Sequence, residues 1–517
     1  QTSEGHVLRI DPESGKVELL VAGLRNPFGI DFNRDGEMFT YDADAEYDMG
    51  APWYRPTRVN HLVVGGDYGW RGVTKSWPPY YCDRADNAHR NLDIGKGSPT
   101  AVKFGTRSNF PKRYREALFV LDWAYGRVLA VNMVPRGASY LMAAETFLQG
   151  RPLNVTDIEF APDGSMYLIT GGRKTRSAIY RVQFTGDSPQ VDDEASEYRQ
   201  SCEQFAADSR ARRRRLEGQL REQPDRKRLP EIIETHDDQD PWIQYASANL
   251  LERYPIEWWA DTALQGASTR AMLSLARADH AKMREPILQA LNSLSLADMS
   301  VSQMLEVLQA YELVLRSDES LGQNLTVETS KRLQAIYPSR HYRVNRLLSE
   351  LLTKMRVSSA TAATIDLLRS TNDPVQQLQY LYVLRNVTAG WTLSDRRTYF
   401  RSLNQADQFL GGAGMPEFLA KIREEATATL DTIERDALAD ELKPKPIREV
   451  HQLPPREFVR QWKVDELLAS FDADRQPNLK NGKAMFAAAS CSRCHRIAGE
   501  GTLIGPDLTS ASGRYTP

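Results

Sequence analysis

The hydrophobic pattern of this 517-residue chain changes near residue 190, and this change decides most of what the chain can fold into. Residues 1–187 hold short runs in which apolar and polar residues alternate, separated by Asp-Gly, Gly-Gly and Pro turns, a pattern typical of β-strands. In residues 188–441 apolar residues recur at helical spacing instead. The sequence therefore predicts a strand region followed by an all-α region.

The strand region contains an internal repeat. Residues 28–39 and 156–167 each read as a strand, an Asp-Gly turn and a second strand, and residues 98–104 and 117–122 form a further pair. Roughly 50 to 65 residues make one four-stranded unit, which is the spacing of propeller blades. About three and a half such units fit, so we expect a partial β-propeller whose N-terminal part lies outside this sequence.

The helical region shows a weaker repeat. Asp240-Pro241 and Asp373-Pro374 each place an Asp cap and a first-turn proline before the same apolar pattern, 133 residues apart. This separation would hold three helical hairpins of about 44 residues, as in a HEAT-like solenoid. A helical domain without repeats remains the alternative. Five arginines in residues 210–215 are predicted to form a solvated helix face rather than a docking site for an acidic partner.

Composition excludes some classes of function. The formal net charge is −2, which argues against nucleic acid or an anionic membrane surface as a partner. The sequence has no run of 18 apolar residues, so no membrane span is predicted. A chain of this length is expected to form about three domains.

The sequence Cys491-Ser492-Arg493-Cys494-His495 carries the most specific chemistry. At this spacing two thiols can each add to a haem vinyl group while the adjacent imidazole ligates the iron. A zinc half-site or a redox pair is the alternative, but the other two cysteines, Cys82 and Cys202, are far apart in the sequence. The motif predicts haem c attached through Cys491 and Cys494, with His495 as axial ligand.

The flanks of this motif resemble the first half of a class I cytochrome c. A short helix is predicted over 480–489, and Gly-Pro and Gly-Arg pairs follow at 505–506 and 513–514. The resemblance implies that the Pro506 carbonyl accepts a hydrogen bond from the His495 ring and that Arg514 lies near a haem propionate. No methionine follows Met485, so the sixth iron ligand is not assigned and the chain is expected to end inside this domain.

Three segments of the strand region, residues 23–29, 58–62 and 65–70, resemble the soluble quinoprotein glucose and sorbosone dehydrogenases. That family consists of six-bladed propellers that use pyrroloquinoline quinone (PQQ) and calcium. The resemblance implies that Arg25 and Asn26 contact the quinone, where a guanidinium would stabilise negative charge. The family's catalytic histidine would lie upstream of Arg25, where only His6 occurs, and His6 is predicted to be structural. No catalytic residue is therefore assigned.

The family's calcium loop is replaced here by alternating carboxylates and a Pro-Trp-rich insertion. Carboxylate oxygens suit calcium, although the glycine and glutamate of an EF-hand loop are absent. On a strand these carboxylates would share one face, either solvated or paired with Arg55 and Arg58. The candidate calcium ligands are Asp42, Asp44, Glu46 and Asp48. His61 and His89 are expected to be ordinary hydrogen-bonded histidines.

The order of parts resembles the multidomain haem-binding dehydrogenase-like proteins of planctomycetes and verrucomicrobia. The expected divisions are a partial quinoprotein-like propeller over 1–187, HEAT-like helices over 188–441, a Pro-rich linker over 442–472 and the N-terminal part of a cytochrome c domain over 473–517. The expected function is haem electron transfer, fed by a PQQ-dependent sugar or alcohol dehydrogenase in the same chain. The alternative is a non-enzymatic binding or scaffold protein that carries a haem relay.

The resemblance also implies partners and a location. A small sugar or alcohol and a redox partner protein are expected to bind. Haem c is attached outside the cytoplasmic membrane, so a periplasmic or exported protein is expected, although the sequence carries no leader peptide.

Overall fold

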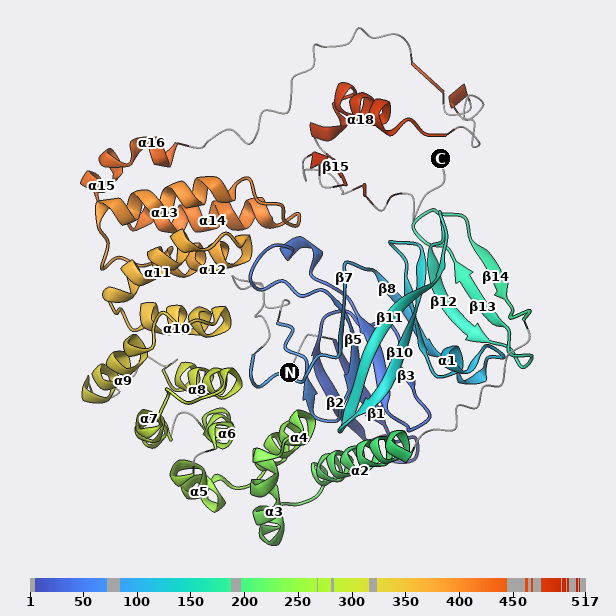
Figure 1. Cartoon of the computed structure of the whole chain (residues 1–517), viewed down its shortest axis with the longest axis horizontal. Coiled ribbons are helices and arrows are strands. Elements are labelled where there is room, and N and C mark those ends of the chain that lie inside the picture. Colours follow the sequence, from blue (N-terminus) through green and yellow to red (C-terminus); the bar gives the residue numbers. More distant parts are fainter. Residues whose placement is uncertain are drawn as a thin grey trace.

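A computed structural model gives the fold (Figure 1). The described residues are 5–71, 84–186, 197–266, 268–279, 283–315, 323–443, 461–463, 466–467, 476–493, 495–498, 500–501, 508–509 and 511. Strands occupy the first part of the chain and helices the middle part. The chain is thus multidomain, with a β-sheet region and a helical region.

The strand region forms four sheets that follow one another along the chain, except that β6 joins the first sheet after β5 of the second. Neighbouring strands are antiparallel except β2 and β6, which are parallel. The first sheet contains β1 (Gly5–Ile10), β2 (Val17–Leu24) and β6 (Gly66–Asp67); the second β3 (Asp31–Phe32), β4 (Met38–Asp42), β5 (Thr57–Leu62) and β7 (Leu92–Gly95); the third β8 (Pro99–Phe104), β9 (Leu118–Asp122), β10 (Arg127–Arg136) and β11 (Ser139–Gln149); and the fourth β12 (Val155–Phe160), β13 (Met166–Thr170) and β14 (Ala178–Val182).

The structure confirms the internal repeat. The β3–β4 and β12–β13 connections are the same tight turn, in which Gly36 N–H donates to Asn33 O (3.0 Å) and Gly164 N–H donates to Ala161 O (2.9 Å). Both glycines have a positive φ, 75° and 77°, which side chains other than glycine adopt only with strain. The Asp-Gly signal is therefore local backbone chemistry, repeated once in each hairpin.

Successive sheets pack face to face, and β9 shows how. Leu118 and Val120 on one side of β9 join a core with the second sheet, whereas Phe119 and Leu121 on the other side join a core with the fourth sheet. All four are fully buried. Because side chains alternate along a strand, one continuous apolar run serves both cores. This face-to-face stacking is the arrangement that propeller blades use.

The helices follow as an arc along one side of the sheets (Figure 1). None of the helices in the described ranges is both long and apolar enough to cross a bilayer. The helices are α2 (Glu197–Gln219), α3 (Leu229–Glu234), α4 (Pro241–Leu251), α5 (Ala260–Gln265), α6 (Thr269–Asp279), α7 (Arg284–Ser293), α8 (Val301–Val314), α9 (Gln323–Ala335), α10 (Tyr342–Lys354), α11 (Ser359–Ser370), α12 (Pro374–Leu384), α13 (Leu393–Ala406), α14 (Met415–Ala428), α15 (Thr432–Ala437) and α16 (Ala439–Leu442); a short α1 (Lys112–Arg115) lies in the strand region.

The two predicted Asp-Pro caps are both present. Asp240 accepts from Trp242 N–H (2.9 Å), and Asp373 accepts from Val375 N–H (2.9 Å). Asp240 also accepts from Ala138 N–H (2.6 Å) at the β10–β11 turn. The first cap therefore joins the helices to the sheets as well as starting its own helix.

The arginine run at 210–215 is not simply a solvated face, and for Arg210 and Arg213 that prediction is wrong. Both side chains are buried against the β3–β4 turn. Arg213 Nη2 lies 2.5 Å from Glu37 Oε2, and Arg210 Nη2 lies 3.1 Å from Asp35 Oδ2. The run does dock on acidic groups, but these belong to the same chain, which overall charge cannot indicate.

A buried polar network surrounds this contact. The His61 ring lies between Glu37 Oε2 (2.8 Å from Nε2) and Ser139 Oγ (2.9 Å from Nδ1). Burial lowers the pKa of His61 to about 4, so its ring is neutral at pH 7. Burial opposes ionisation of Glu37, but the hydrogen bond from His61 and the charge of Arg213 outweigh it and lower the Glu37 pKa to about 2. The network therefore holds one ionised carboxylate against a buried guanidinium.

Glu37→Gln tests how much the Glu37–Arg213 ion pair contributes to the free energy of unfolding. Removing the carboxylate takes away the nearer acidic partner of the buried Arg213 charge and leaves Glu217, whose Oε1 lies 3.5 Å from Arg213 Nε. Breaking such a buried pair costs about 3–5 kcal/mol in the free energy of unfolding. Denaturant unfolding at pH 7, followed by circular dichroism, measures the loss. Glu145→Gln is the matched control, because Glu145 pairs with Arg113 on the exposed surface and should cost less than about 1 kcal/mol. Equal losses in the two variants would contradict the role assigned to the buried pair.

The Pro-Trp-rich insertion makes the second contact between sheets and helices. Trp53 is 4% exposed and packs edge-on against Tyr382 (5.5 Å between ring centroids) and Phe418 (5.3 Å). Ala45 and Ala51 join the same core, which is otherwise built from residues of α11–α16 and their connecting segments. The insertion therefore anchors the far end of the helical arc to the second sheet.

Trp53→Ala should loosen this end of the arc. Truncating a buried tryptophan costs about 3–5 kcal/mol through lost burial and a cavity. Hydrogen exchange should accelerate in α12 and α14 while α4 keeps its protection. Tyr47→Ala is the control, because Tyr47 belongs to the same insertion and is 58% exposed. Unchanged exchange in α12 and α14 would show that Trp53 does not anchor them.

Candidate cofactor sites in the sheets and near the C-terminus

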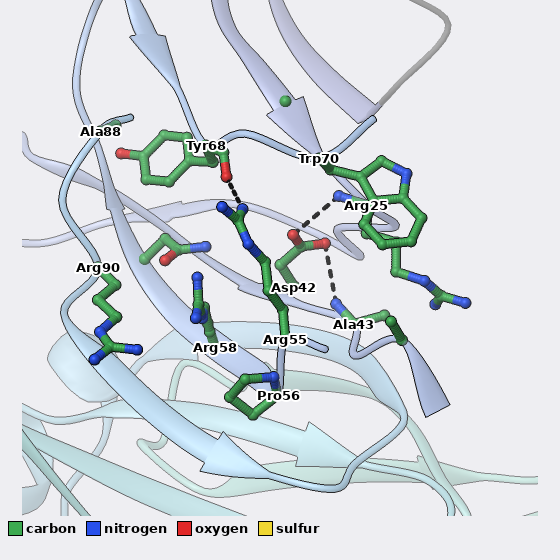
Figure 2. Close-up of a pocket in the computed structure, with 13 residues that line it drawn as sticks. Arg25, Asp42, Ala43, Arg55, Pro56, Arg58, Tyr68, Trp70, Ala88 and Arg90 are labelled. Atoms are coloured by element: carbon green, nitrogen blue, oxygen red, sulfur yellow. Dashed lines mark hydrogen bonds between the residues drawn. The ribbon is translucent and has the colours of Figure 1, made fainter. Parts of the chain in front are cut away.

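A pocket rich in arginine lies at the end of the first and second sheets (Figure 2). It contains about 390 Å³ of empty space, part of it open to solvent. Four arginines and a single carboxylate line it, so its walls are mainly cationic. The lining residues are Gly23, Arg25, Asp42, Ala43, Ala45, Arg55, Pro56, Arg58, Asn60, Tyr68, Trp70, Ala88 and Arg90.

The fold brings together two of the segments that resemble quinoproteins. Tyr68 N–H donates to Ala22 O (2.9 Å), and Trp70 N–H donates to Gly23 O (2.8 Å). Gly23 has a φ of 72°, and a Cβ there would lie 2.2 Å from Asp67 Oδ1. Only glycine allows this close approach, so residues 23–29 and 65–70 form one wall of the pocket.

Asp42 fixes the backbone of this wall. Its carboxylate accepts from Arg25 N–H (3.0 Å), Asn26 N–H (2.8 Å) and Ala43 N–H (3.0 Å). Burial raises the pKa of Asp42, and these three hydrogen bonds act against that rise. Both oxygens already accept backbone hydrogen bonds, so Asp42 serves to position Arg25 and Asn26.

Arg25 is one of the residues that line the pocket, whereas Asn26 is exposed and does not line it. The Arg25 guanidinium lies over the Trp70 ring, 5.3 Å from its centroid. Its Nε is buried and has no hydrogen-bond partner in the described part of the chain. An unpaired donor in a cationic pocket fits an anionic group such as a carboxylate of PQQ.

The other three arginines are held by protein groups. Figure 2 shows Arg55 directed to the Tyr68 carbonyl, to which it donates. Arg58 Nε lies 2.9 Å from one oxygen of Asp93, and Arg90 Nη1 lies 3.0 Å from the other. Sequence reasoning missed Arg90 and Tyr68 as pocket residues, because only the folded chain brings residues 68 and 90 beside β4 and β5.

The four candidate calcium ligands do not share a strand face. Strand β4 ends at Asp42, and the following residues enter a 3-10 turn, Glu46–Asp48, with Glu46 exposed. Across the described ranges no three Asp, Glu, His or Cys side chains form a group that could hold a metal ion. Calcium binding thus stays a prediction without a described site.

Asp44 and Asp48 are buried beside Arg25. Burial raises the pKa of Asp44 to about 7 and that of Asp48 to about 6, and the Arg25 charge opposes both shifts. The charge of Glu46 raises the pKa of Asp44 further. At neutral pH the carboxyl of Asp44 is therefore about half protonated, an unusual state for an aspartate.

Asp44→Asn should remove a pH dependence of stability. The unfolded Asp44 ionises above its ordinary pKa of 3.8, but the folded one keeps its proton up to about pH 7. Ionisation therefore favours the unfolded chain in this window, and stability falls as pH rises through it. Between pH 5 and pH 8 the wild type should lose about 2–3 kcal/mol that Asp44→Asn retains.

Denaturant unfolding at the two pH values measures this difference. Asp366→Asn is the control, because the Asp366 side chain is 72% exposed and should leave the pH dependence as it is in the wild type. The same pH dependence in wild type and Asp44→Asn would contradict a raised pKa at Asp44.

The cysteine-histidine motif follows α18 (Leu479–Ala488), which confirms the predicted helix to within one residue. Cys491 begins a 3-10 turn, Cys491–Arg493, and His495 N–H donates to Cys491 O (2.8 Å). Strand β15 (Arg496–Ile497) then pairs with β16 (Glu500–Gly501). Cys491 and His495 are both half-buried at the two ends of one turn, an arrangement that suits attachment of haem through a thiol and an imidazole.

Gly501 allows the β15–β16 hairpin to close directly after His495. Its φ is 100°, and a Cβ there would lie 2.1 Å from His495 O. Cys494, Pro506 and Arg514 lie outside the described residues, so their predicted roles in haem binding stay predictions.

Comparison with known families identifies the C-terminal segment. The family model for cytochrome c matches residues 479–517, which include α18, Cys491 and His495. This segment is a cytochrome c segment, and the family supports haem c as its cofactor. Among curated proteins, none matches the chain.

Two solved structures are similar to the strand region. An oxidoreductase from Thermus thermophilus, described as a glucose dehydrogenase, is 23% identical over 32% of this chain and 47% of its own, with a TM-score of 0.23. The PQQ-bound aldose sugar dehydrogenase of Streptomyces coelicolor is 14% identical over 34% of this chain and 51% of its own, with a TM-score of 0.24. The chain spans about half the length of these structures. Scores of this size do not establish a shared fold.

Proposed function

We propose that this chain is an electron-transfer protein that carries haem c. The observation that carries the proposal is the cytochrome c match over residues 479–517, in which Cys491 and His495 lie on one hydrogen-bonded turn. Cys491 and Cys494 would hold the haem, His495 would ligate its iron, and Pro506 and Arg514 would support the pocket. When bound, haem supplies one-electron oxidation and reduction.

We infer that the electrons come from the arginine-lined pocket, acting as a PQQ-dependent sugar or alcohol dehydrogenase site. Bound PQQ would supply a two-electron acceptor. Arg25, positioned by Asp42, would bind its anionic groups and stabilise negative charge through the unpaired Nε. Asn26 is kept as a second candidate contact, and no step depends on calcium.

This function implies two partners and a location. A small sugar or alcohol would be oxidised, and a separate redox protein would take electrons from the haem. Because covalent haem attachment takes place outside the cytoplasmic membrane, we propose a periplasmic or exported protein. The helices from α2 to α16 would act as a HEAT-like scaffold between the two cofactors.

The test uses the full chain loaded with haem and PQQ. Aldoses, sorbosone and alcohols are added in turn, and the reduced haem band is followed by absorbance. Substrate should reduce the haem in the wild type, and Arg25→Met should slow this step by about 10²-fold. Reduction by dithionite should be unchanged in both, and Arg113→Met, on the exposed surface, should behave as the wild type.

Two results would overturn the dehydrogenase half. One is haem that stays oxidised with every substrate although PQQ is bound. The other is an equal rate in Arg25→Met and wild type. Loss of covalent haem in the double variant Cys491→Ala with Cys494→Ala, detected in the denatured protein, tests the electron-transfer half separately, because either thioether alone would still hold the haem.

A second candidate function is a binding scaffold with a haem relay. It is favoured by the pocket arginines that protein groups already hold, Arg55 by the Tyr68 carbonyl and Arg58 and Arg90 by Asp93. Such a pocket needs no cofactor to be stable. Mass spectrometry after reconstitution with PQQ distinguishes the two functions: no bound quinone, together with retained glycan binding, supports the scaffold.

A further inference from the structure

Arg496, the residue after the haem-ligand candidate His495, directs its side chain away from its own segment. Its Nη1 donates to the carbonyl of Gly411 (3.0 Å), in the connection between α13 and α14. Arg496 is only 8% exposed. Its backbone is tied locally, because its carbonyl accepts from Leu508 N–H (2.7 Å) and the residue pairs with Gly501 across β15 and β16. The side chain therefore links a fixed backbone to another domain.

The surroundings of Arg496 indicate docking rather than local charge pairing. Within the described ranges it forms no ion pair with a carboxylate, and its Nε has no hydrogen-bond partner. A buried guanidinium is costly unless it is bonded. The bond to Gly411 is the described interaction that offsets this cost, so the segment loses it if it leaves the helices.

The loop that receives Arg496 is itself braced against the strand region. Gly412 N–H donates to Met49 O (2.6 Å), and Gly414 N–H donates to Tyr47 O (2.8 Å). A Cβ on Gly412 would lie 2.1 Å from Glu46 O. The sequence Gly-Gly-Ala-Gly at 411–414 thus permits two backbones to pack directly together, a role that sequence analysis did not assign.

Residues 46–49, which contact the 411–414 loop, also lie near the pocket. Residues 46–49 carry Asp48, which is buried and close enough to Arg25 for the guanidinium charge to lower its pKa. Arg25 lines the pocket. The pocket wall is therefore linked to the residue beside His495 in three steps: the electrostatic interaction of Arg25 with Asp48, the backbone hydrogen bonds of the 411–414 loop to Tyr47 and Met49, and the hydrogen bond of Arg496 to that loop.

We propose that Arg496 is a positioning residue that seats the haem-attachment segment on the 411–414 loop, braced against the arginine-lined pocket. This docking would keep the haem close to the pocket for electron transfer, a role that rests on the proposed function. The docking itself requires neither a quinone nor a substrate. The partner surface is thus internal: a glycine-rich helical connection that offers a carbonyl to the arginine.

The experiment uses the haem-loaded full chain with a fluorophore on Leu410→Cys, a position that is 67% exposed and adjacent to Gly411. Cys82→Ser and Cys202→Ser remove the two cysteines of the sequence outside the haem motif, so that the label reacts only at position 410. Haem quenches a nearby fluorophore by energy transfer, so docking should keep the label dim. Arg496→Met should restore the brightness of the haem-free chain, and Arg496→Lys, which keeps a cationic donor, should retain part of the quenching.

Lys483→Met is the matched control. Lys483 pairs with Glu500 inside the segment (2.7 Å) and both are exposed, so this variant should quench as the wild type does. Full quenching in Arg496→Met, with haem content equal to wild type by absorbance, would overturn the proposal.

A second variant covers failure of Arg496→Met to bind haem. Gly412→Ala leaves the haem segment unchanged but removes the close packing of the loop, and it should also relieve quenching; full quenching there would overturn the proposal. The readout is independent of substrate. Absent sugar-driven reduction with normal quenching would therefore reject the dehydrogenase function alone, whereas normal reduction with unchanged quenching in Arg496→Met would reject the docking role alone.

Discussion

The ion pair of Glu37 with Arg213 is the interaction on which the arrangement of sheets and helices depends. Glu37 is 5% exposed and Arg213 is 1% exposed. Separating them would leave two charges away from water, each at a cost of several kcal/mol. Because Glu37 immediately precedes β4 and Arg213 lies in α2, the pair orients the first long helix on the second sheet. The helices that follow inherit this orientation.

The same two strands serve the interface and the pocket. Strands β4 and β5 are paired so that Phe39 lies opposite His61 and Asp42 lies opposite Arg58. One end of this pair holds the buried network and the other end holds two pocket residues. The Trp53 insertion then leaves the pocket end and enters the core of α11–α14. The helical arc is thus attached to the second sheet at both ends, with the pocket between the two attachments.

Local chemistry explains which parts of this fold are predictable. The Asp-Gly turns, the Asp-Pro caps and the helix before Cys491 each depend on residues within a few positions, and the structure confirms all three. The sequence places Arg213 in solvent because its partner Glu37 lies 176 residues away. It suggests Asp42 as a metal ligand because the donors to its carboxylate, three backbone N–H groups, are invisible in a sequence. Whether a charged side chain is buried depends on partners that are distant in the sequence. The hydrophobic periodicity of a segment gives no information about such partners.

The hydrogen bond that holds the haem-attachment segment on the helices is weaker than the ion pair that holds the helices on the sheets. This difference suits a protein that passes electrons to a separate partner. A hydrogen bond from a charged donor such as Arg496 contributes about 1.5–3 kcal/mol. Since each 1.4 kcal/mol is about tenfold in an equilibrium, that bond alone holds the segment in place by a factor of about 10 to 10². Breaking the Glu37–Arg213 contact costs more, about 3–5 kcal/mol. On the proposed function, the haem segment can therefore leave the 411–414 loop to meet a redox partner while the sheets and helices stay assembled. The sheets and helices keep the pocket intact, while the haem-attachment segment is held only weakly on the 411–414 loop. The haem could therefore accept electrons near the pocket and then donate them to a partner protein.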